Sequence, residues 1–269
     1  MTNAPATQKT PGSLALVGAG PGARDLLTLR AMQRLQQADT VFYDRLVDEE
    51  VLELAPPAAN RVFVGKHVGA HAWPQDRINA VIVAEALKGR RVVRLKSGDP
   101  GIFGRVAEEL AAARAAGIDA EIVPGVTAAC AAAAQTGIPL TERGVSDTLV
   151  LTTAKCKAGD PLPDCARYAK PGTTLVFYMS VGQASRVRDG LLRLGMPPST
   201  PVTIAVDVSK PTARTVFCDI DAMPEAVDLH EISGCATIAI TYPKLKPGQI
   251  PLQDNEVILT NSAARGGLT

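Results

Sequence analysis

The first half of the chain alternates short apolar runs with longer segments of helical periodicity, and this alternation constrains the fold more than any other feature. Each apolar run has the length of a strand, and each intervening segment is long enough to cross back over a sheet. Strands joined in this way lie parallel, with both faces of the sheet covered by helices. The expected strands are 14–18, 40–44, 61–65, 91–95 and 120–124, and the expected helices are 25–36, 78–89, 106–117 and 126–137.

The alternation stops at Gly137, where the segment 137–147 is rich in turn-forming residues and has no apolar period. A domain junction is therefore expected there. After it, apolar runs outnumber helical segments, which is typical of a mixed sheet with antiparallel strands. The expected strands are 148–154, 174–179, 201–207, 215–219 and 236–241, with helices near 182–195 and 221–228.

These patterns predict an α/β fold with two domains and an active-site cleft between them. Both ends of the chain lack a continuous apolar period and are expected to be loose extensions. The expected boundaries are a flexible N-terminal tail over 1–12, an N-terminal α/β domain with a parallel sheet over 13–140, a C-terminal α/β domain with a mixed sheet over 146–245, and a C-terminal tail over 246–269.

Charge and composition argue against several classes of protein. The chain has 28 Lys and Arg against 27 Asp and Glu, whereas nucleic-acid-binding proteins usually carry a basic excess. It has no apolar run long enough to span a membrane and no signal-peptide pattern. The five cysteines are odd in number and show no C-x-x-C spacing, so a reduced, cytoplasmic location is expected. Glycines interleave His67 and His71, and no metal site is expected.

The segment Gly18-Ala19-Gly20-Pro21-Gly22 follows the first expected strand and opens a helix. With Ala23 it satisfies the dinucleotide pattern G-x-G-x-x-[GA], so a nicotinamide-dependent oxidoreductase is one alternative. Pro21 argues against it, because proline lacks the backbone N–H that a pyrophosphate would need. A tight turn without a ligand is the other alternative. In either case the glycines indicate a close approach of the backbone to a neighbouring group.

The segment Ser97-Gly98-Asp99-Pro100-Gly101 follows the fourth expected strand, at the edge of a parallel sheet where ligands bind. A carboxylate there suits an ammonium or sulfonium group and would repel a phosphate. The alternative is that Asp99 forms an Asx turn. Two further segments leave the same choice open: Thr127 in PGVTA could simply cap a helix, and Met179 in YMSVG could simply pack in the core.

Basic residues stand at loop positions along the chain. If they converge on one cleft, they suit a substrate with several carboxylates, because guanidinium binds carboxylate in a bidentate manner. For any one of them, a solvated surface charge is the alternative. These residues are Arg45, Lys66, Lys96, Arg105 and Arg143.

Taken in order along the chain, these segments resemble the tetrapyrrole methylase family. The resemblance extends from about Leu14 to Lys244 and is most specific for the members that methylate uroporphyrinogen III. It implies a homodimer that uses S-adenosylmethionine, releases S-adenosylhomocysteine and methylates carbons 2 and 7, giving precorrin-2 for cobalamin, sirohaem or haem d1 synthesis. The segments that carry it are VGAGPG, YDRLV, RVVRLKSGDP, PGVTA, GIPLTERG and TLVFYMSVG.

The resemblance also implies roles for residues at matching positions. The pyrrole carbon is itself the nucleophile in methyl transfer, so the protein mainly positions the reactants and excludes water. Arg105 is expected to act electrostatically, since arginine stays protonated, and Glu108 to handle the released proton. The residues expected to hold the cofactor are Pro21, Ser97, Gly98, Asp99, Thr127, Ala128, Met179, Val208 and Ala236. Those expected at the macrocycle are Arg45, Lys66, Arg105, Glu108, Arg143 and Met179.

The chain departs from the family pattern in several places. Ser97 replaces the first glycine of a usual G-G-D-P, and Gly101 follows the proline. SGDPGI is thereby similar to the methyltransferases that act later in corrin synthesis, so a later precorrin is an alternative substrate. The other departures are Ala23 for a usual aspartate, Val106 for a usual glycine, and Thr153-Ala154-Lys155 where T-G-H is frequent.

Overall fold

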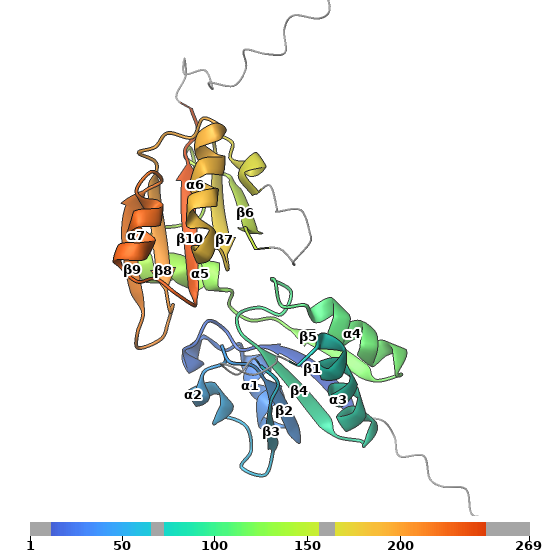
Figure 1. Ribbon diagram of the computed structural model, residues 1–269. Coiled ribbons are helices and arrows are strands. Elements are labelled where there is room, and N and C mark those ends of the chain that lie inside the picture. Colours follow the sequence, from blue (N-terminus) through green and yellow to red (C-terminus); the bar gives the residue numbers. More distant parts are fainter. Residues whose placement is uncertain (1–11, 66–72, 156–164, 246–269) are drawn as a thin grey trace, which may run out of the picture. The chain divides into compact units, whose positions relative to one another are not determined.

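The computed structural model describes residues 12–65, 73–155 and 165–245 (Figure 1). They form two compact units. Unit 1 comprises the described residues up to Ala131 together with Ser209–Pro211, and unit 2 comprises Ala132–Val208 and the described residues from Thr212 onward. Lys66, both histidines of the His67/His71 pair and the two expected tails, apart from Gly12, lie outside the described residues.

Unit 1 contains a five-stranded sheet in which all strands are parallel, as predicted. The strand order is β3-β2-β4-β1-β5, so all five carboxyl ends, and the loops that follow them, lie along one edge. The strands are β1 (Ser13–Gly18), β2 (Thr40–Tyr43), β3 (Asn60–Phe63), β4 (Arg91–Lys96) and β5 (Asp119–Val123).

Helices cover both faces of this sheet. Alternate residues of β1 supply two separate apolar clusters, because successive side chains of a strand point to opposite faces. Val17 packs with α1 and α2, and Leu16 packs with α3 and α4. The sequence did not predict α2, whose single turn is too short for a helical period. The helices are α1 (Leu29–Gln36), α2 (Glu49–Leu52), α3 (Gln75–Leu87), α4 (Val106–Ala115) and α5 (Ala128–Thr136), with a 3-10 turn at Arg24–Leu26.

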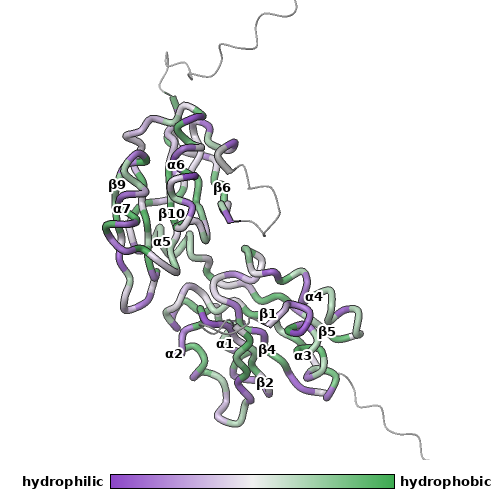
Figure 2. Tube along the Cα trace, in the orientation of Figure 1, coloured by the Kyte–Doolittle hydropathy of each residue, from purple (hydrophilic) through white to green (hydrophobic). Residues whose placement is uncertain are grey.

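Unit 2 contains a mixed five-stranded sheet, also as predicted. Its order is β6-β7-β10-β8-β9, in which only the β6–β7 pairing is parallel. Hydrophobic residues dominate interior strands such as β1 in unit 1 and β10 in unit 2 (Figure 2). The strands are β6 (Thr148–Thr153), β7 (Thr173–Tyr178), β8 (Pro201–Val206), β9 (Arg214–Asp219) and β10 (Ala236–Tyr242), and the helices are α6 (Ala184–Arg193) and α7 (Met223–Leu229), with 3-10 turns at Cys165–Tyr168 and Val181–Gln183.

The division between the units falls within α5, between Ala131 and Ala132. The division therefore lies several residues before the junction expected at 137–147. The turn-forming residues mark where the helix ends, whereas the two units are defined by which half of the molecule each part of the helix contacts. The segment Ser209–Pro211 groups with unit 1 although it follows a strand of unit 2. None of the helices in the described part of the chain is long and apolar enough to span a membrane.

Candidate functional site

Three glycine-containing loops meet at the carboxyl edge of the unit 1 sheet, after β1, β4 and β5. Gly98 N–H donates to the Gly20 carbonyl at 2.7 Å, and Gly20 N–H donates back at 3.3 Å. Both residues have a φ of +69°, which glycine adopts without strain. A Cβ on Gly125 would lie 2.3 Å from the Gly98 oxygen and 2.9 Å from the Gly18 Cα. We refer to Gly18, Gly20, Gly98 and Gly125 as the glycine junction.

Asp99 ties two of these loops together. Its Oδ1 accepts a hydrogen bond from Gly101 N–H at 2.8 Å, and its Oδ2 accepts one from Gly125 N–H at 3.0 Å. The first bond is the Asx turn that the sequence left open. Because a carboxylate offers about four acceptor positions, these two bonds do not exhaust it. Asp99 therefore forms the Asx turn, and it can still accept a hydrogen bond from a bound ligand.

The remaining cofactor residues predicted in unit 1 lie beside the glycine junction, in space or along the chain. Thr127 Cα lies 3.9 Å from the position of a Cβ on Gly98. The Thr127 carbonyl accepts from Cys130 N–H at 3.1 Å and from Ala131 N–H at 3.2 Å, so this residue lies at the N-terminal cap position of α5, as the structural alternative predicted. The other three are chain neighbours of residues already described: Pro21 follows Gly20, Ser97 precedes Gly98 and Ala128 follows Thr127. Pro21 is buried.

The sequence did not predict that Ser209–Pro211 would contact the first glycine loop. Ala23 N–H donates to the Ser209 Oγ at 3.1 Å. A Cβ on Gly22 would lie 2.8 Å from the Lys210 Cγ. No local pattern in the chain indicates this long-range contact. The resemblance implied a cofactor-binding role only for Val208, which directly precedes Ser209.

Four predicted site residues lie in unit 2: Arg143, Met179, Val208 and Ala236. Met179, directly after β7, is 50% exposed and has a φ of 54°. Core packing, which the sequence left open for Met179, is therefore wrong. A non-glycine residue at positive φ is strained, and such residues are frequent at ligand sites. Arg143 is exposed, Val208 is buried and Ala236 begins β10.

Arg105 and Glu108 form an ion pair at the start of α4. The Arg105 guanidinium donates to Glu108 Oε1 at 2.8 Å and to Oε2 at 2.7 Å. Glu108 raises the pKa of Arg105, which stays protonated. Both side chains are about half exposed, at 53% and 48%. Exposed pairs contribute little to stability, so Arg105 can exchange Glu108 for another carboxylate at small cost. Arg45 is also exposed, after β2.

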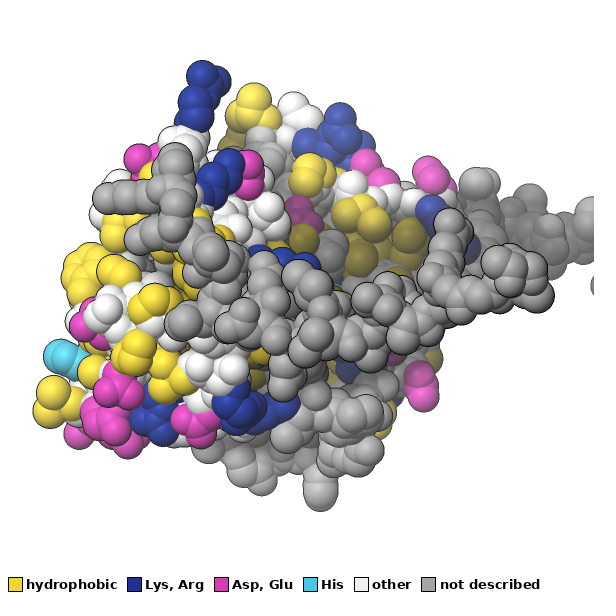
Figure 3. Space-filling model, turned by 90° about the horizontal axis from the view of Figure 1, so that it is seen from above, with side chains coloured by type: hydrophobic (Ala, Val, Ile, Leu, Met, Phe, Trp, Pro, Cys, Tyr) yellow, Lys and Arg dark blue, Asp and Glu magenta, His cyan; other side chains and the backbone are white. Residues whose placement is uncertain are grey.

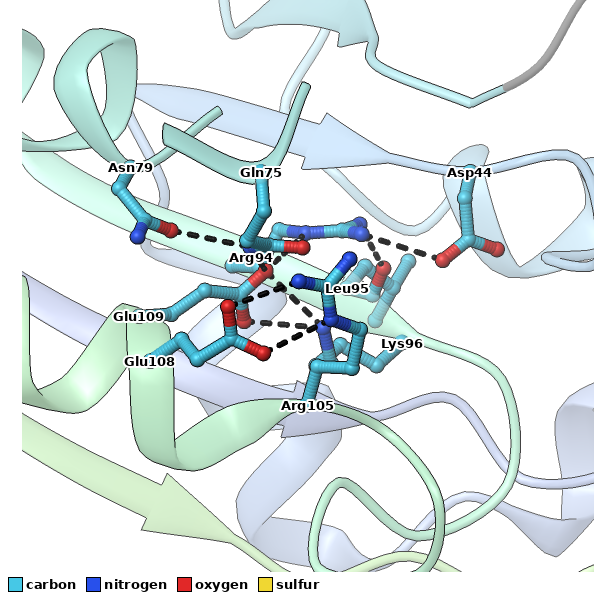
Figure 4. A network of polar contacts seen from close by, with 9 residues as sticks. All are labelled: Asp44, Gln75, Asn79, Arg94, Leu95, Lys96, Arg105, Glu108 and Glu109. Atoms are coloured by element: carbon cyan, nitrogen blue, oxygen red, sulfur yellow. Dashed lines mark hydrogen bonds and ion pairs between the residues drawn. The ribbon is translucent and has the colours of Figure 1, made fainter. Parts of the chain in front are cut away.

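For Lys96 the sequence left two alternatives open, a cleft residue for substrate carboxylates or a solvated surface charge, and the structure supports neither. The side chains of Lys96, Arg94 and Glu109 are only 7%, 5% and 1% exposed. Lys96 Nζ donates to both Glu109 oxygens, at 3.0 and 2.9 Å, so the lysine neutralises a buried carboxylate (Figure 4). The sequence did not reveal this buried pair, because Lys96 was expected in the loop after the strand 91–95. In the structure it is the last residue of β4.

The same carboxylate binds two further groups, and together they form a network across the carboxyl end of β4. Arg94 Nε donates to Glu109 Oε1 at 3.2 Å, and Gln75 Nε2 donates to it at 3.3 Å. The Arg94 Nη2 group also donates to Asp44 Oδ2 at 3.2 Å. We refer to Asp44, Gln75, Arg94, Lys96 and Glu109 as the buried network.

Lys96 is expected to make the stability of the protein depend on pH. Burial and the neighbouring Arg94 lower the pKa of Lys96 below its ordinary value of 10.5, although Glu109 opposes them. Between the lowered pKa and 10.5, the unfolded chain binds a proton that the folded chain lacks, so the free energy of unfolding rises with pH. Urea denaturation across this range should show that the wild type gains stability relative to Lys96→Met. A constant difference between the two proteins would contradict the shift.

The surface charges do not form one extended patch of a single sign on the face shown in Figure 3, where basic and acidic side chains lie interspersed. Within the ranges that the structure describes, no group of three His, Cys, Asp or Glu side chains is placed to hold a metal ion. In unit 1, the backbone and the carboxylate at the glycine junction and the exposed Arg45 and Arg105 follow strands at the same edge of the sheet.

Comparison with known proteins points to one family. A family model described as tetrapyrrole (corrin/porphyrin) methylases matches residues 13–224. The siroheme synthase of Psychrobacter sp. (strain PRwf-1) is 45% identical over 224 residues, which are 82% of this chain and 46% of that protein. The chain thus spans about half the length of the curated relatives it matches.

Two solved structures extend the likeness to the fold. The uroporphyrin-III C-methyltransferase from Thermus thermophilus, complexed with S-adenosylhomocysteine, is 37% identical with a TM-score of 0.73, covering 85% of this chain and 97% of that chain. A cobalt precorrin-4 methyltransferase is 29% identical with a TM-score of 0.77, covering 85% and 94%. Both similarities include residues from the two units.

Proposed function

The chain belongs to the tetrapyrrole (corrin/porphyrin) methylase family, and from this premise we propose that it transfers methyl groups from S-adenosylmethionine to carbons 2 and 7 of uroporphyrinogen III, forming precorrin-2 by way of precorrin-1. The observation that carries the proposal is that a backbone-lined glycine junction and exposed arginines lie at the same edge of one parallel sheet. The first suits a methyl donor with an amino-acid group, and the second suits a substrate with carboxylate arms.

The residues at the glycine junction fit S-adenosylmethionine better than a dinucleotide. The unused acceptor positions of Asp99 attract an ammonium or a sulfonium and repel a phosphate. Pro21 removes a backbone donor that a pyrophosphate would need. We therefore assign the cofactor to Pro21, Ser97, Gly98, Asp99, Thr127 and Ala128 in unit 1, with Met179, Val208 and Ala236 in unit 2.

The reaction requires little acid–base chemistry from the protein. Bound S-adenosylmethionine would supply the methyl group to the electron-rich pyrrole carbon by an in-line displacement, in which the sulfur–methyl bond breaks and S-adenosylhomocysteine is released. Arg45, Arg105 and Arg143 bind the acetate and propionate arms, and we assign the same role to Lys66. Arg105 exchanges Glu108 for a substrate carboxylate, which leaves the Glu108 carboxylate able to accept the proton that the macrocycle releases. Arg105 itself stays protonated and stabilises charge.

S-adenosylhomocysteine is expected to bind the protein and NADH is not. Calorimetric titration of the two ligands, under the same buffer and salt conditions, separates a methyltransferase from the nicotinamide-dependent oxidoreductase that G-x-G-x-x-A alone would suggest. The Asp99 carboxylate is the physical reason, since its negative charge would repel a pyrophosphate. Tight NADH binding without S-adenosylhomocysteine binding would contradict the assignment.

A later precorrin is the second candidate substrate. SGDPGI at 97–102 favours it, and so does the similarity to the cobalt precorrin-4 methyltransferase. The greater sequence identity to the uroporphyrin-III enzyme favours the first candidate. Parallel assays with uroporphyrinogen III and with precorrin-2 derivatives decide between them. Activity on the derivatives alone would support the second candidate.

We also propose that the active form is a homodimer and that its product enters the synthesis of sirohaem, cobalamin or haem d1. Siroheme synthases among the curated relatives support the sirohaem branch, although the chain spans about half of their length. Sedimentation equilibrium of the purified protein tests the dimer, with a monomer at assay concentration as the contradicting result.

A further inference from the structure

We propose that Glu109 is a positioning residue for tetrapyrrole binding: through Lys96 and Arg94 it fixes two substrate-binding groups relative to each other. The two groups are Arg45 on one side and the Arg105–Glu108 pair on the other. The inference rests on the proposed function, because it concerns the same macrocycle. Glu109 itself has no direct contact with the macrocycle in this assignment, since its side chain is only 1% exposed.

The connections of Arg94 place the two groups. Its guanidinium donates to Glu109 at 3.2 Å and to Asp44 at 3.2 Å. Glu109 directly follows Glu108, and Asp44 directly precedes Arg45. One buried guanidinium therefore spans the helix turn that bears Glu108 and the loop that bears Arg45. Figure 4 shows Arg94 between the two carboxylates.

Lys96 anchors the helix to the sheet. Arg94 and Lys96 are two apart on β4, so their side chains lie on the same face as Val92, the face covered by α3 and α4. Near the amino end of β4, Val92 joins an apolar cluster. At the carboxyl end, the buried network takes the place of such packing and holds the first turn of α4 on the strand.

Stability alone does not account for charges at this place. Apolar residues of similar volume often stabilise a protein as well as a buried ion pair does, whereas an ion pair also requires one geometry. That geometry is satisfied here, because no buried side-chain nitrogen or oxygen in the described part of the chain lacks a hydrogen-bond partner. By contrast, Arg105 and Glu108 are about half exposed. A fixed inner layer thus supports an outer pair that can exchange partners.

The cofactor loops have supports of their own. Gly98 is bonded to Gly20, and Asp99 is bonded to Gly125. Loss of the Glu109 anchor should therefore displace the macrocycle-binding residues and leave the cofactor residues in place. This difference separates a positioning role from general destabilisation.

The test measures binding of uroporphyrin III, the stable oxidised form that keeps the carboxylate arms, by quenching of the fluorescence of Trp73, the single tryptophan. The variants are Glu109→Gln, which removes the charge, and Glu109→Asp, which keeps the charge and shortens the reach. Glu85→Gln is the matched control. It also removes a glutamate that pairs with an arginine, Arg90 at 2.8 Å, but Glu85 lies at the end of α3 opposite to Gln75 and the buried network. S-adenosylhomocysteine binding is measured by calorimetry on the same samples.

Both Glu109 variants are expected to weaken uroporphyrin III binding by about 10- to 100-fold, with S-adenosylhomocysteine binding unchanged. Glu85→Gln should bind both ligands as the wild type does. If Glu109→Gln does not fold, Glu109→Asp alone decides. Equal uroporphyrin III affinity in Glu109→Asp and Glu85→Gln, or parallel loss of both ligands, would overturn the positioning role. A wild-type protein that does not bind uroporphyrin III would instead overturn the proposed function, and the inference with it.

Discussion

Replacing Arg105 by alanine is expected to lower kcat/KM for methyl transfer to uroporphyrinogen III by about 100-fold or more. In the proposed site, the guanidinium donates two charge-assisted hydrogen bonds to one carboxylate arm of the substrate, as it does to Glu108 in the structure. Each such bond contributes ~1.5–3 kcal/mol, and ~1.4 kcal/mol corresponds to a tenfold change. Arg105→Lys should recover part of the activity, because lysine keeps the charge and lacks the planar fork.

Arg114→Ala is the control for this experiment. Arg114 is exposed in the last turn of α4, the same helix that begins after Arg105. Its removal should leave kcat/KM unchanged. Steady-state assays with both variants compare the two ends of the helix directly, and equal activity of Arg105→Ala and Arg114→Ala would remove Arg105 from the substrate site.

Replacing Gly125 by alanine is expected to weaken S-adenosylhomocysteine binding by about 100-fold and to lower the free energy of unfolding by ~1–3 kcal/mol. The new Cβ would lie 2.3 Å from the Gly98 oxygen, whereas ordinary contact begins at 3.4 Å. The loops after β4 and β5 must therefore separate by roughly 1 Å, and a displacement of that size is enough to disrupt a binding geometry. Titration calorimetry and urea denaturation measure the two effects.

Gly117→Ala provides the matched control for Gly125→Ala. Gly117 has a φ of +70°, and a Cβ there would meet no heavy atom of the described residues within 4 Å, its chain neighbours apart, so the substitution strains only the backbone. It should reduce stability by ~1–2 kcal/mol and leave S-adenosylhomocysteine binding unchanged. If both variants bind the ligand equally well, the glycine junction does not hold the cofactor.

Much of this architecture could be predicted from local patterns. Strands such as β1 and β8 are short apolar runs bounded by turn residues, and all ten expected strands are present. The glycines of the first loop were expected to mark a close backbone approach. The contacts of Gly18 and Gly20 with Gly98 confirm this. Such features depend on a few neighbouring residues, so the local sequence pattern is enough to predict them.

The features that sequence reasoning missed depend on contacts between distant segments. Lys96 was expected in the loop after the strand 91–95, yet it is the last residue of β4 and is buried against Glu109 of α4. Ser209 reaches Ala23 across most of the chain. For the burial of Lys96, the adjacent acids Glu108 and Glu109 gave a usable signal in the sequence. Two neighbouring residues of a helix point in different directions, so one of the two could face the sheet.

The most direct test of the central claim is to incubate the protein with uroporphyrinogen III and S-adenosylmethionine labelled with carbon-13 in its methyl group, under anaerobic conditions. Mass spectrometry and NMR then count and locate the label. We expect two labelled methyl groups on ring carbons 2 and 7 of each macrocycle. An unlabelled macrocycle, recovered intact from a protein that binds S-adenosylhomocysteine, would contradict the assignment, as would label at other positions.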